Sequence, residues 1–290
     1  MRELLRAQTG ETAGASAPLA VAQPSFKDLF SAQARIVTNA PVTGLFLCST
    51  DGTVAEICAG AGFDYLLVDG EHSPFTLAQI QVTLRVIAAY PTLALVRVPA
   101  NDEVLIKQYL DAGAQSILVP MVDSVEQAQV AARAVAYPPA GVRGVGSALA
   151  RSARWNRIPR YLASARETIS LVVQIESAQA VEYATDIAAV EGMDGLFVGP
   201  SDLAASMGLI GQQSHPDVVA AVKETIGAAK RAGKIVGVNA FDRTQAEEYV
   251  AAGADFVNVG ADVALLARAT EQLAGSWLNP RSGGKERTSY

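Results

Sequence analysis

The sequence has few aromatic residues, few cysteines and no long hydrophobic run. Aromatic residues make up 6% of its 290 residues. No stretch approaches the roughly 20 apolar residues of a membrane-spanning helix, so a membrane partner is not expected. Cys48 and Cys58 match no zinc or redox spacing, and we expect reduced core thiols in a cytoplasmic protein. The net charge of −6 gives no reason to expect a nucleic acid as a partner.

The two ends of the chain differ in composition from the rest. Residues 1–25 are rich in Ala, Gly, Thr and Pro and lack the apolar stretch of a signal peptide. We expect a flexible extension there, with an organelle transit peptide as the weaker alternative. Residues 279–290 have the composition of a disordered tail. One folded domain is therefore expected over residues 26–278, a normal length for one α/β barrel.

Half of the residues are hydrophobic, and a recurring pattern places many of them in short strands. A helical stretch ends in glycine, a few residues follow, and a continuous apolar run begins. Glycine readily takes the left-handed conformation that ends a helix, and continuous apolar runs are typical of strands buried on both faces of a parallel sheet. The pattern occurs at Gly62–Val68, Gly113–Val119, Gly192–Val198, Gly233–Val238 and Gly253–Val259.

Three further apolar runs bring the predicted strands to eight: Gly44–Cys48, Leu93–Val98 and Leu171–Ile175. The segments between them have helical spacing, and several open with cap signals such as Ser124 with Gln127. This alternation favours an α/β fold, a closed (β/α)₈ TIM barrel, over the alternative of a doubly wound open sheet. The segment Phe26–Ala34 would form an extra helix before the first strand.

Polar residues follow the predicted strands, at the end of a barrel where catalytic residues gather. Glu176 follows the fifth strand and Asp202 the sixth. Adjacent strands lie about 4.8 Å apart, so both carboxylates can reach one cation. Oxygen ligands select a hard ion such as Mg²⁺ or Mn²⁺. The alternative is a pair of solvated or helix-capping acids.

His72 and Arg97 are candidates for proton transfer and anion binding. His72 lies beside Asp69 and Glu71 after the second strand, and a carboxylate can orient an imidazole and raise its basicity. Arg97 stands in an apolar strand and needs a carboxylate or a substrate anion as its partner. Next to a metal, such a guanidinium can stabilise an enolate oxygen. The alternatives are an ordinary loop histidine and a structural ion pair.

Two further features concern anions. The turn from Gly199 to Asp202 joins a strand to a helix, and its backbone N–H groups can hold a carboxylate or phosphate. Between Gln127 and Arg166 there are seven arginines and no Asp or Glu. This stretch either attracts an acidic substrate or pairs with acids of a neighbouring subunit.

These residues stand in motifs that resemble one enzyme family, the 4-hydroxy-2-oxoheptanedioate aldolases and 2-dehydro-3-deoxyglucarate aldolases, which are class II pyruvate aldolases. The resemblance runs from about Gly44 to Trp277, with several motifs in the same order. The matching stretches are Phe63–His72, Val96–Pro99, Lys107–Ala114, Tyr137–Val145, Val173–Ser177, Asp194–Leu203 and Phe256–Gly260.

The resemblance implies a lyase that forms or cleaves 4-hydroxy-2-oxo acids through an aldehyde and the enolate of pyruvate or hydroxypyruvate. Glu176 and Asp202 would hold Mg²⁺ or Mn²⁺, with Co²⁺ as an alternative. His72 would act in acid–base chemistry, oriented by Asp69 and by Asp111 of a neighbouring subunit.

The substrate contacts and the assembly are implied in the same way. Arg97 would stabilise the enolate, with Gln174 close by, and the backbone at Ser201 and Asp202 would hold the pyruvate carboxylate. The assembly would be a homohexamer, a trimer of dimers whose subunits exchange their last helix.

Asn239 departs from the family pattern. Relatives often have an apolar residue, commonly Leu, at this position near the aldehyde end of the site. Asn239 would therefore contact substrate, and its amide would favour a hydroxylated acceptor or a donor such as hydroxypyruvate.

Other activities are less well supported. Oxaloacetate decarboxylase and macrophomate synthase-like enzymes use the same enolate and are the main alternative. A lyase acting on coenzyme A thioesters uses a related barrel, but the Asp69-Gly-Glu-His72 motif favours the aldolases. Lys107 and Lys234 do not stand at strand ends, which argues against a Schiff-base aldolase. A non-enzymatic scaffold is disfavoured by the full set of base, arginine and metal ligands.

Overall fold

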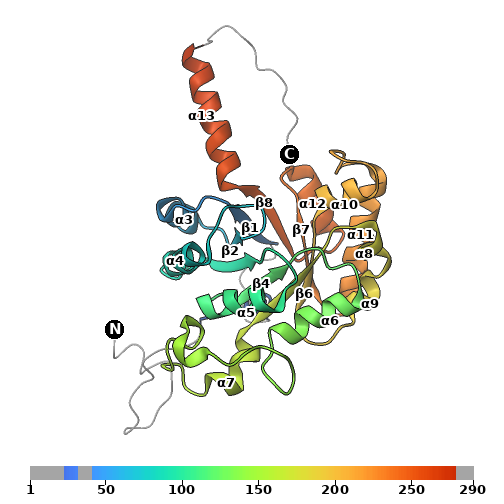
Figure 1. Ribbon diagram of the computed structural model, residues 1–290. Helices are drawn as coiled ribbons and strands as arrows, with labels where there is room; N and C mark the ends of the chain where they lie inside the picture. The colour runs from blue at the N-terminus through green and yellow to red at the C-terminus, as the bar shows by residue number, and fades with distance from the viewer. Residues whose placement is uncertain (1–22, 32–40, 279–290) are drawn as a thin grey trace.

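A computed structural model describes residues 23–31 and 41–278. Eight parallel strands pair in chain order and close into one barrel, with helices around it (Figure 1). The predicted (β/α)₈ barrel is therefore confirmed, and the alternative of an open doubly wound sheet is wrong. The predicted extension and tail fall mainly on residues 1–22 and 279–290, outside the described residues.

The barrel strands are short, as the apolar runs predicted. They are β1 (Val42–Leu47), β2 (Tyr65–Asp69), β3 (Leu93–Arg97), β4 (Ser116–Val119), β5 (Ser170–Ile175), β6 (Gly195–Val198), β7 (Ile235–Asn239) and β8 (Phe256–Ala261).

Helices connect consecutive strands. The α-helices are α3 (Gly52–Ala59), α4 (Leu77–Ile87), α5 (Glu103–Ala112), α6 (Val125–Ala134), α7 (Tyr161–Ser164), α8 (Ala178–Glu182), α9 (Ala184–Ala188), α10 (Pro200–Ser206), α11 (Pro216–Arg231), α12 (Arg243–Ala251) and α13 (Asp262–Leu278). Short 3₁₀ helices are η1 (Phe26–Phe30), η2 (Ser147–Leu149), η3 (Arg151–Ala153) and η4 (Ala165–Thr168).

The structure confirms the predicted glycine conformations and the predicted helix cap at Ser124. All five glycines that open the repeated pattern have positive φ, from 69° at Gly233 to 109° at Gly253, which a residue with a side chain adopts only with strain. The hydroxyl of Ser124 accepts a hydrogen bond from the backbone N–H of Gln127 at 3.3 Å. Local sequence therefore predicts the left-handed turn before β2, β4, β6, β7 and β8 and the start of α6.

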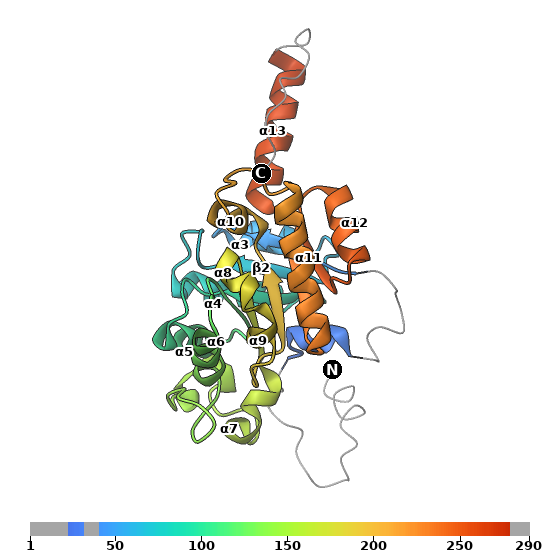
Figure 2. The same cartoon turned by 90° about the vertical axis from the view of Figure 1, so that its right-hand side faces the viewer.

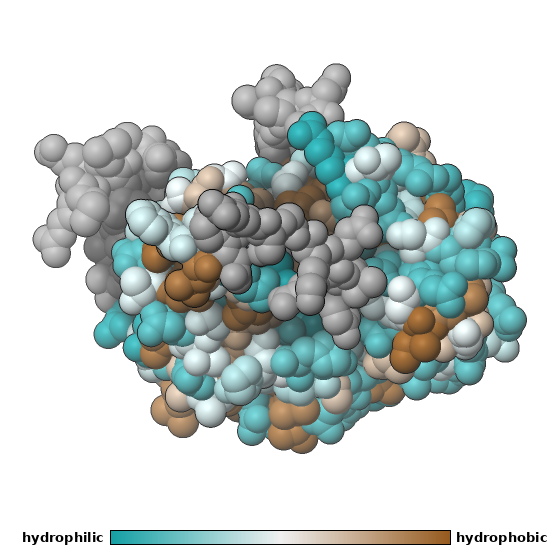
Figure 3. Space-filling model, turned by 90° about the horizontal axis from the view of Figure 1, so that it is seen from above, coloured by the Kyte–Doolittle hydropathy of each residue, from teal (hydrophilic) through white to brown (hydrophobic). Residues whose placement is uncertain are grey.

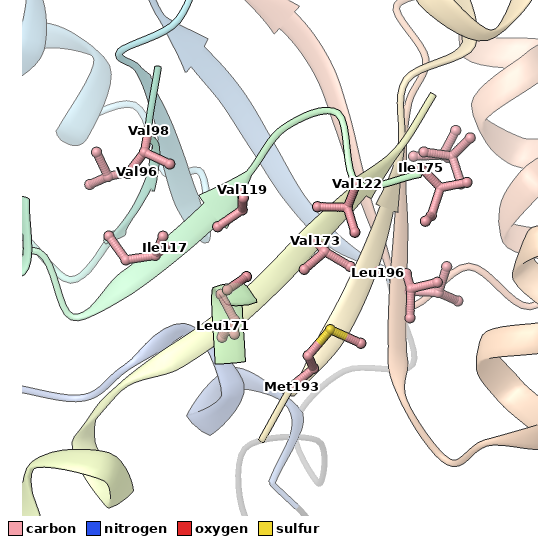
Figure 4. Close-up of a cluster of buried hydrophobic side chains, with 14 of the residues drawn as sticks. Val96, Val98, Ile117, Val119, Val122, Leu171, Val173, Ile175, Met193 and Leu196 are labelled. Carbon is pink, nitrogen blue, oxygen red and sulfur yellow. The ribbon is translucent and has the colours of Figure 1, made fainter. Parts of the chain in front are cut away.

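Each strand is buried on both faces. One set of side chains packs between the sheet and the surrounding helices, and Figure 4 shows part of it, including Val96, Ile117, Val173 and Leu196 on neighbouring strands. The alternate set fills the barrel interior and includes the clustered aromatic rings of Tyr65, Phe197 and Phe256. Because side chains alternate along a strand, the last inward-facing residue of each strand borders the end of the barrel.

The helix η1 covers the opposite, N-terminal end of the barrel. Phe26 is fully buried and its ring packs edge-on against Tyr65 and Phe256. Its backbone N–H donates to the hydroxyl of Ser116 at 2.8 Å. The expected extra helix thus begins where predicted but is a 3₁₀ helix ending at Phe30, and residues 32–40 lie outside the described part.

The last helix, α13, projects away from the barrel in both side views (Figures 1 and 2). Asp262 fixes its start, because its buried carboxylate accepts hydrogen bonds from the backbone N–H groups of Cys48 and Ser49 at 2.8 and 2.9 Å. Beyond it, Leu266 is 61% exposed, Leu273 62% and Trp277 78%. None of the helices in the described part has the length and apolarity needed to span a bilayer.

Candidate active site at the carboxyl ends of the strands

A cavity of about 670 Å³ lies over the carboxyl ends of the strands. Figure 3 views the molecule from the side where α13 begins, and hydrophilic residues predominate on this face. The lining residues are Phe46, Cys48, Asp69, His72, Arg97, Gln174, Phe197, Gly199, Pro200, Ser201, Asp202, Gln213, Ser214, Asn239, Ala240, Phe241, Asp242, Gln245 and Ala261. Seven of the predicted site residues are therefore in one cavity: Asp69, His72, Arg97, Gln174, Ser201, Asp202 and Asn239.

Arg97 is held by carboxylates of its own chain. Only 5% of it is exposed, and two of its nitrogens, Nε and Nη2, lie 2.9 Å from Oδ1 of Asp69. Its third nitrogen, Nη1, lies 3.0 Å from Oε2 of Glu71. The guanidinium also lies over the ring of Phe46, with 5.2 Å between its central carbon and the ring centre. Arg97 is thus a pre-positioned cation at the cavity wall.

Asp69 organises both Arg97 and the segment that follows β2. Its Oδ1 accepts hydrogen bonds from the backbone N–H groups of Glu71 and His72 at 3.1 and 3.3 Å. Burial opposes ionisation, but the hydrogen bonds from Arg97 and these N–H groups outweigh it and lower the pKa of Asp69. Asp69 is therefore an anion that holds the loop and the arginine together.

The imidazole of His72 is at the mouth of the cavity. Its side chain is 66% exposed, and Nε2 lies 3.7 Å from Oε2 of Glu71. The carboxylate next to the ring is thus Glu71, while Asp69 contacts the backbone of His72. This places an exchangeable proton site beside a carboxylate, as general acid–base chemistry requires.

Glu176 is a buried carboxylate between β5 and β4. Only 2% of it is exposed. Its Oε1 accepts a hydrogen bond from the backbone N–H of Met121 at 2.8 Å, and its Oε2 accepts one from the amide of Gln174. Met121 adopts a φ of 52°, which is uncommon for a residue with a side chain. This loop conformation directs a backbone donor at the carboxylate.

The negative charges around Glu176 favour the binding of a cation. Burial raises the pKa of Glu176 to about 7, and the nearby negative charges of Asp202 and Glu71 add to the rise, against the hydrogen bonds from Met121 and Gln174. The side-chain oxygen of Gln174 is buried without a hydrogen-bond partner in the described structure. A divalent cation would relieve both features, and oxygen donors are those that Mg²⁺ and Mn²⁺ prefer. No group of three or more His, Cys, Asp and Glu side chains within residues 23–31 and 41–278 gathers into a metal cage, so Glu176 and Asp202 would share the ion with other oxygens.

Ser201 and Asp202 occupy the first turn of α10. The helix follows Gly199, with Pro200 at its first position, and the first N–H groups of a helix have no partner within it. Gly199 keeps this turn close to β5, because a Cβ there would lie 2.8 Å from Oε2 of Glu176. Backbone donors and the Asp202 carboxylate thus border the cavity together.

Asp111 does not line this cavity. It lies at the end of α5 and pairs with Arg143, whose Nη2 is 3.0 Å from Oδ1 of Asp111. Arg143 is fully buried, and its guanidinium lies over the ring of Tyr137, 4.6 Å from its centre. At least one arginine of the acid-free stretch therefore pairs with a carboxylate of its own chain, an outcome that neither sequence hypothesis included.

Several site residues were not selected from the sequence. Glu71 was noted only as a neighbour of His72, yet it holds Arg97. Met121 contributes its backbone N–H group, and the identity of the residue does not predict that contact. Gln213, Ser214 and Gln245 lie between or within helices rather than at strand ends, so the strand-end rule could not select them.

Comparison with known proteins places this geometry in a family. The family model described as HpcH/HpaI aldolase/citrate lyase matches residues 42–269. A protein of Deinococcus radiodurans named hydroxypyruvate/pyruvate aldolase is 52% identical over 237 residues, which cover 82% of this chain and 86% of that protein. A 4-hydroxy-2-oxo-heptane-1,7-dioate aldolase of Shigella sonnei is 48% identical over 244 residues, covering 84% and 93%.

Solved structures agree with the fold. A crystal structure of a HpcH/HpaI aldolase/citrate lyase family protein from Burkholderia cenocepacia is 40% identical, with a TM-score of 0.78, and the match covers 81% of this chain and 94% of that one. Macrophomate synthase, at 24% identity and a TM-score of 0.75, shares the fold.

The family match and the aldolase relatives, together with the closed barrel and its cavity of charged residues, identify a carbon–carbon lyase of the class II pyruvate aldolase type. The chain belongs to the HpcH/HpaI aldolase/citrate lyase family, which confirms the resemblance inferred from its motifs.

Proposed function

We propose that this enzyme is a divalent-metal-dependent aldolase that joins pyruvate, or hydroxypyruvate, to an aldehyde and cleaves the resulting 4-hydroxy-2-oxo acid. The observation that carries the proposal is the buried Glu176 carboxylate beside the unpartnered amide oxygen of Gln174, with the negative charge of Asp202 and the cationic Arg97 nearby. The donor is supported by the name of the 52% identical relative, a hydroxypyruvate/pyruvate aldolase.

Glu176 and Asp202 would hold Mg²⁺ or Mn²⁺, with Co²⁺ as an alternative. Bound there, the ion would act as a Lewis acid on the 2-oxo group of the donor. These residues would suit such an ion because they offer two carboxylates and the unpartnered amide oxygen of Gln174. The ion would also compensate the buried negative charge of Glu176.

The chain's own groups would bind the donor and move its proton. The N–H groups at Ser201 and Asp202 would bind the donor carboxylate. Arg97, fixed by Asp69 and Glu71, would stabilise the negative oxygen of the enolate as it forms. His72 would exchange protons at the cavity mouth, assisted by Glu71. The enolate carbon would then form a bond to the aldehyde carbon, and the aldehyde oxygen would take up a proton.

Decarboxylation of oxaloacetate is the second candidate activity. The bond between C3 and C4 would break with release of CO₂, and the electron pair would form the same pyruvate enolate at Arg97. The fold shared with macrophomate synthase fits this alternative, although aldolase names belong to the more similar proteins.

We also propose that the active assembly is a homohexamer built from dimers that exchange α13. The apolar side chains Leu266, Leu273 and Trp277 are exposed on a helix that extends away from its own barrel (Figure 2). In such an assembly Asp111 would serve the site of a neighbouring subunit. A cytoplasmic location belongs to this proposal as well and is consistent with the two free thiols.

Proton exchange from pyruvate in D₂O, followed by NMR, tests enolate formation without knowledge of the aldehyde. Metal-stripped protein should exchange slowly, and added Mg²⁺ or Mn²⁺ should accelerate exchange strongly. The variant Arg97→Ala should lose the metal-dependent rate. If no exchange occurs with either metal, pyruvate is not the donor, and the same assay with hydroxypyruvate decides between the donors.

A further inference from the structure

A second cavity, of about 260 Å³, lies at the end of the barrel opposite the candidate active site. It borders the amino ends of β3 and β4, where Leu93 and Ser116 begin these strands, and it shares no lining residue with the candidate active site. Among the described residues that line it, none is acidic and Arg151 is the one basic side chain. The cavity is therefore a separate space with a positively charged wall.

Arg151 is buried without an anionic partner. It is the first residue of η3, and only 6% of it is exposed. Its Nη1 and Nη2 donate to the backbone carbonyls of Gly113 at 3.4 Å and Leu84 at 3.5 Å, which are long hydrogen bonds, and both of these residues line the same cavity. No carboxylate of the described residues pairs with its guanidinium. A buried charge without a partner of opposite sign is costly, so an anion in the cavity would stabilise the protein.

The charged neighbours of Arg151 are also basic. Burial lowers the pKa of Arg151 to about 10, and the positive charges of Arg154 and Arg85 add to the decrease. Arg154 donates to the backbone carbonyl of Arg151 at 3.1 Å, and Arg85 donates to the neutral amide of Gln81 at 2.8 Å. Three arginines thus raise the positive potential at this end of the barrel, and an anion would reduce the repulsion between them.

Gly113 fixes the position of this guanidinium. Its φ of 106° ends α5 in the left-handed conformation, and a Cβ added there would lie 2.2 Å from Nη1 of Arg151. Glycine is therefore required both by the backbone conformation and by the close approach of the arginine. Because the backbone and the guanidinium are fitted to each other, Arg151 has a defined place at the cavity wall before any ligand binds.

We propose that this cavity is a binding site for a small oxyanion, a phosphate or a carboxylate group, held by the guanidinium of Arg151. The planar fork of a guanidinium matches two oxygens of either group. The volume of about 260 Å³ is smaller than the roughly 300–1,000 Å³ of sites for drug-sized ligands, which favours inorganic phosphate or a short carboxylate. Because Arg151 begins η3, the bound anion would join this helix to the amino ends of β3 and β4 and would stabilise the fold without taking part in the reaction.

The experiment follows thermal unfolding of the metal-free protein in inorganic phosphate, acetate or chloride at equal ionic strength. Phosphate or acetate at a hundredfold excess over Kd should raise the Tm by roughly 5–10 °C relative to chloride, and the more effective anion identifies the preferred group. Arg151→Met should lose this rise. Arg157→Met, at an exposed position of the same segment, should keep it, and it also controls for the general stabilisation that phosphate gives to proteins.

Calorimetric titration with the more effective anion measures its affinity directly. Arg151→Lys keeps the charge but not the planar fork, and its affinity should be at least tenfold weaker than that of the wild type. Arg97→Ala should bind the anion as the wild type does, because Arg97 lies in the other cavity.

Three results would overturn the inference. An equal rise in Tm in Arg151→Met and Arg157→Met would show that the anions act on the whole surface. Loss of binding in Arg97→Ala would place the anion in the candidate active site. The absence of saturable binding in the wild type would show that the cavity holds no free anion, as expected if a carboxylate of another segment or of a second copy compensates Arg151. The Arg151→Lys titration decides the question even if Arg151→Met fails to fold, because the lysine keeps the charge at this position.

Discussion

Arg97 and Asp69 are register partners on the adjacent strands β3 and β2, and two guanidinium nitrogens share one carboxylate oxygen at 2.9 Å. Both side chains are almost fully buried, with exposed fractions of 6% and 3%. Glu71 contacts the remaining guanidinium nitrogen. The arginine is therefore fixed before a substrate arrives, and little reorganisation is needed when an enolate forms beside it.

Removing or loosening this arginine should impair enolate formation. Arg97→Ala should lower pyruvate proton exchange by about 10²–10³-fold, the usual effect of losing one donor to a developing oxyanion. Arg97→Lys should restore little, because an ammonium group does not reproduce the planar fork. Asp69→Asn should reduce the free energy of unfolding by about 3 kcal/mol, since it weakens the pairing of a buried charge. Urea unfolding and NMR exchange measure the two effects, and wild-type exchange in Arg97→Lys would contradict a role for the planar guanidinium.

Metal binding should stabilise the protein through Glu176. A hundredfold excess of Mg²⁺ or Mn²⁺ over Kd would add about 2.7 kcal/mol, which corresponds to a rise in Tm of roughly 5–10 °C. Glu176→Gln should lose most of that rise. The exposed carboxylate of Glu182 provides a matched control, and Glu182→Gln should respond to metal as the wild-type protein does.

The metal-free Glu176→Gln protein should be at least as stable as the wild type at pH 8. Burial raises the pKa of Glu176 to about 7, above its usual range. A raised carboxyl pKa means that its contribution to stability is full at low pH and is lost as the pH rises through about 7. Thermal unfolding at pH 6 and pH 8 after chelation tests this, and a large loss of stability in the variant at pH 8 would contradict it.

Gly199→Ala should weaken metal binding without unfolding the barrel. The added Cβ would lie 2.8 Å from Oε2 of Glu176 and 2.9 Å from the amide nitrogen of Gln174. Displacing such supporting contacts typically lowers metal affinity about 10–100-fold. Gly227→Ala on α11 is the control, because its added Cβ would meet a flexible arginine end at 3.1 Å. Calorimetric titration with Mn²⁺ should show weakened binding in Gly199→Ala alone.

Cys48 should react slowly with alkylating agents although it lines the cavity. Burial is the main cause that raises the pKa of its thiol to about 11, against a hydrogen bond from the Ser73 hydroxyl that lowers it. Because the thiolate is the reactive form, the rate of modification by iodoacetamide should rise about tenfold per pH unit between pH 7 and 9. Peptide mass spectrometry measures the site, with Cys48→Ser as the control. A rate independent of pH over this range would rule out a thiol of raised pKa.

The exposed apolar face of α13 should hold the assembly together. The double variant Leu266→Glu with Leu273→Glu places two charges on that face and should convert the proposed hexamer to smaller species, as measured by light scattering. Gln272→Glu, at another exposed position of α13, should keep the wild-type mass. If the double variant keeps its mass, α13 does not hold subunits together.

Local sequence patterns alone predict the barrel and most of the predicted site residues that line the cavity at the carboxyl ends of its strands. Five glycines and the apolar runs that follow them predict five of the strands. This prediction succeeds because the left-handed conformation of a glycine such as Gly113 or Gly253 depends on the local chain and not on contacts with distant residues. The strand-end rule then identified Asp69, His72, Arg97 and Asp202 as site candidates, since parallel pairing brings the carboxyl ends of the strands together.

Tertiary structure decided which groups pair and which remain without partners. Register placed Asp69 opposite Arg97 and left Glu71 near the imidazole. The conformation of Met121 directs its backbone N–H group at Glu176, and this contact cannot be predicted from the type of residue. The buried oxygen of Asn239 and the direction of α13 also depend on three-dimensional surroundings, because hydrogen bonds and packing are set by distances between residues far apart in the chain. The start of α13 is held by Asp262, whose carboxylate accepts hydrogen bonds from the backbone of Cys48 and Ser49 at the other end of the chain.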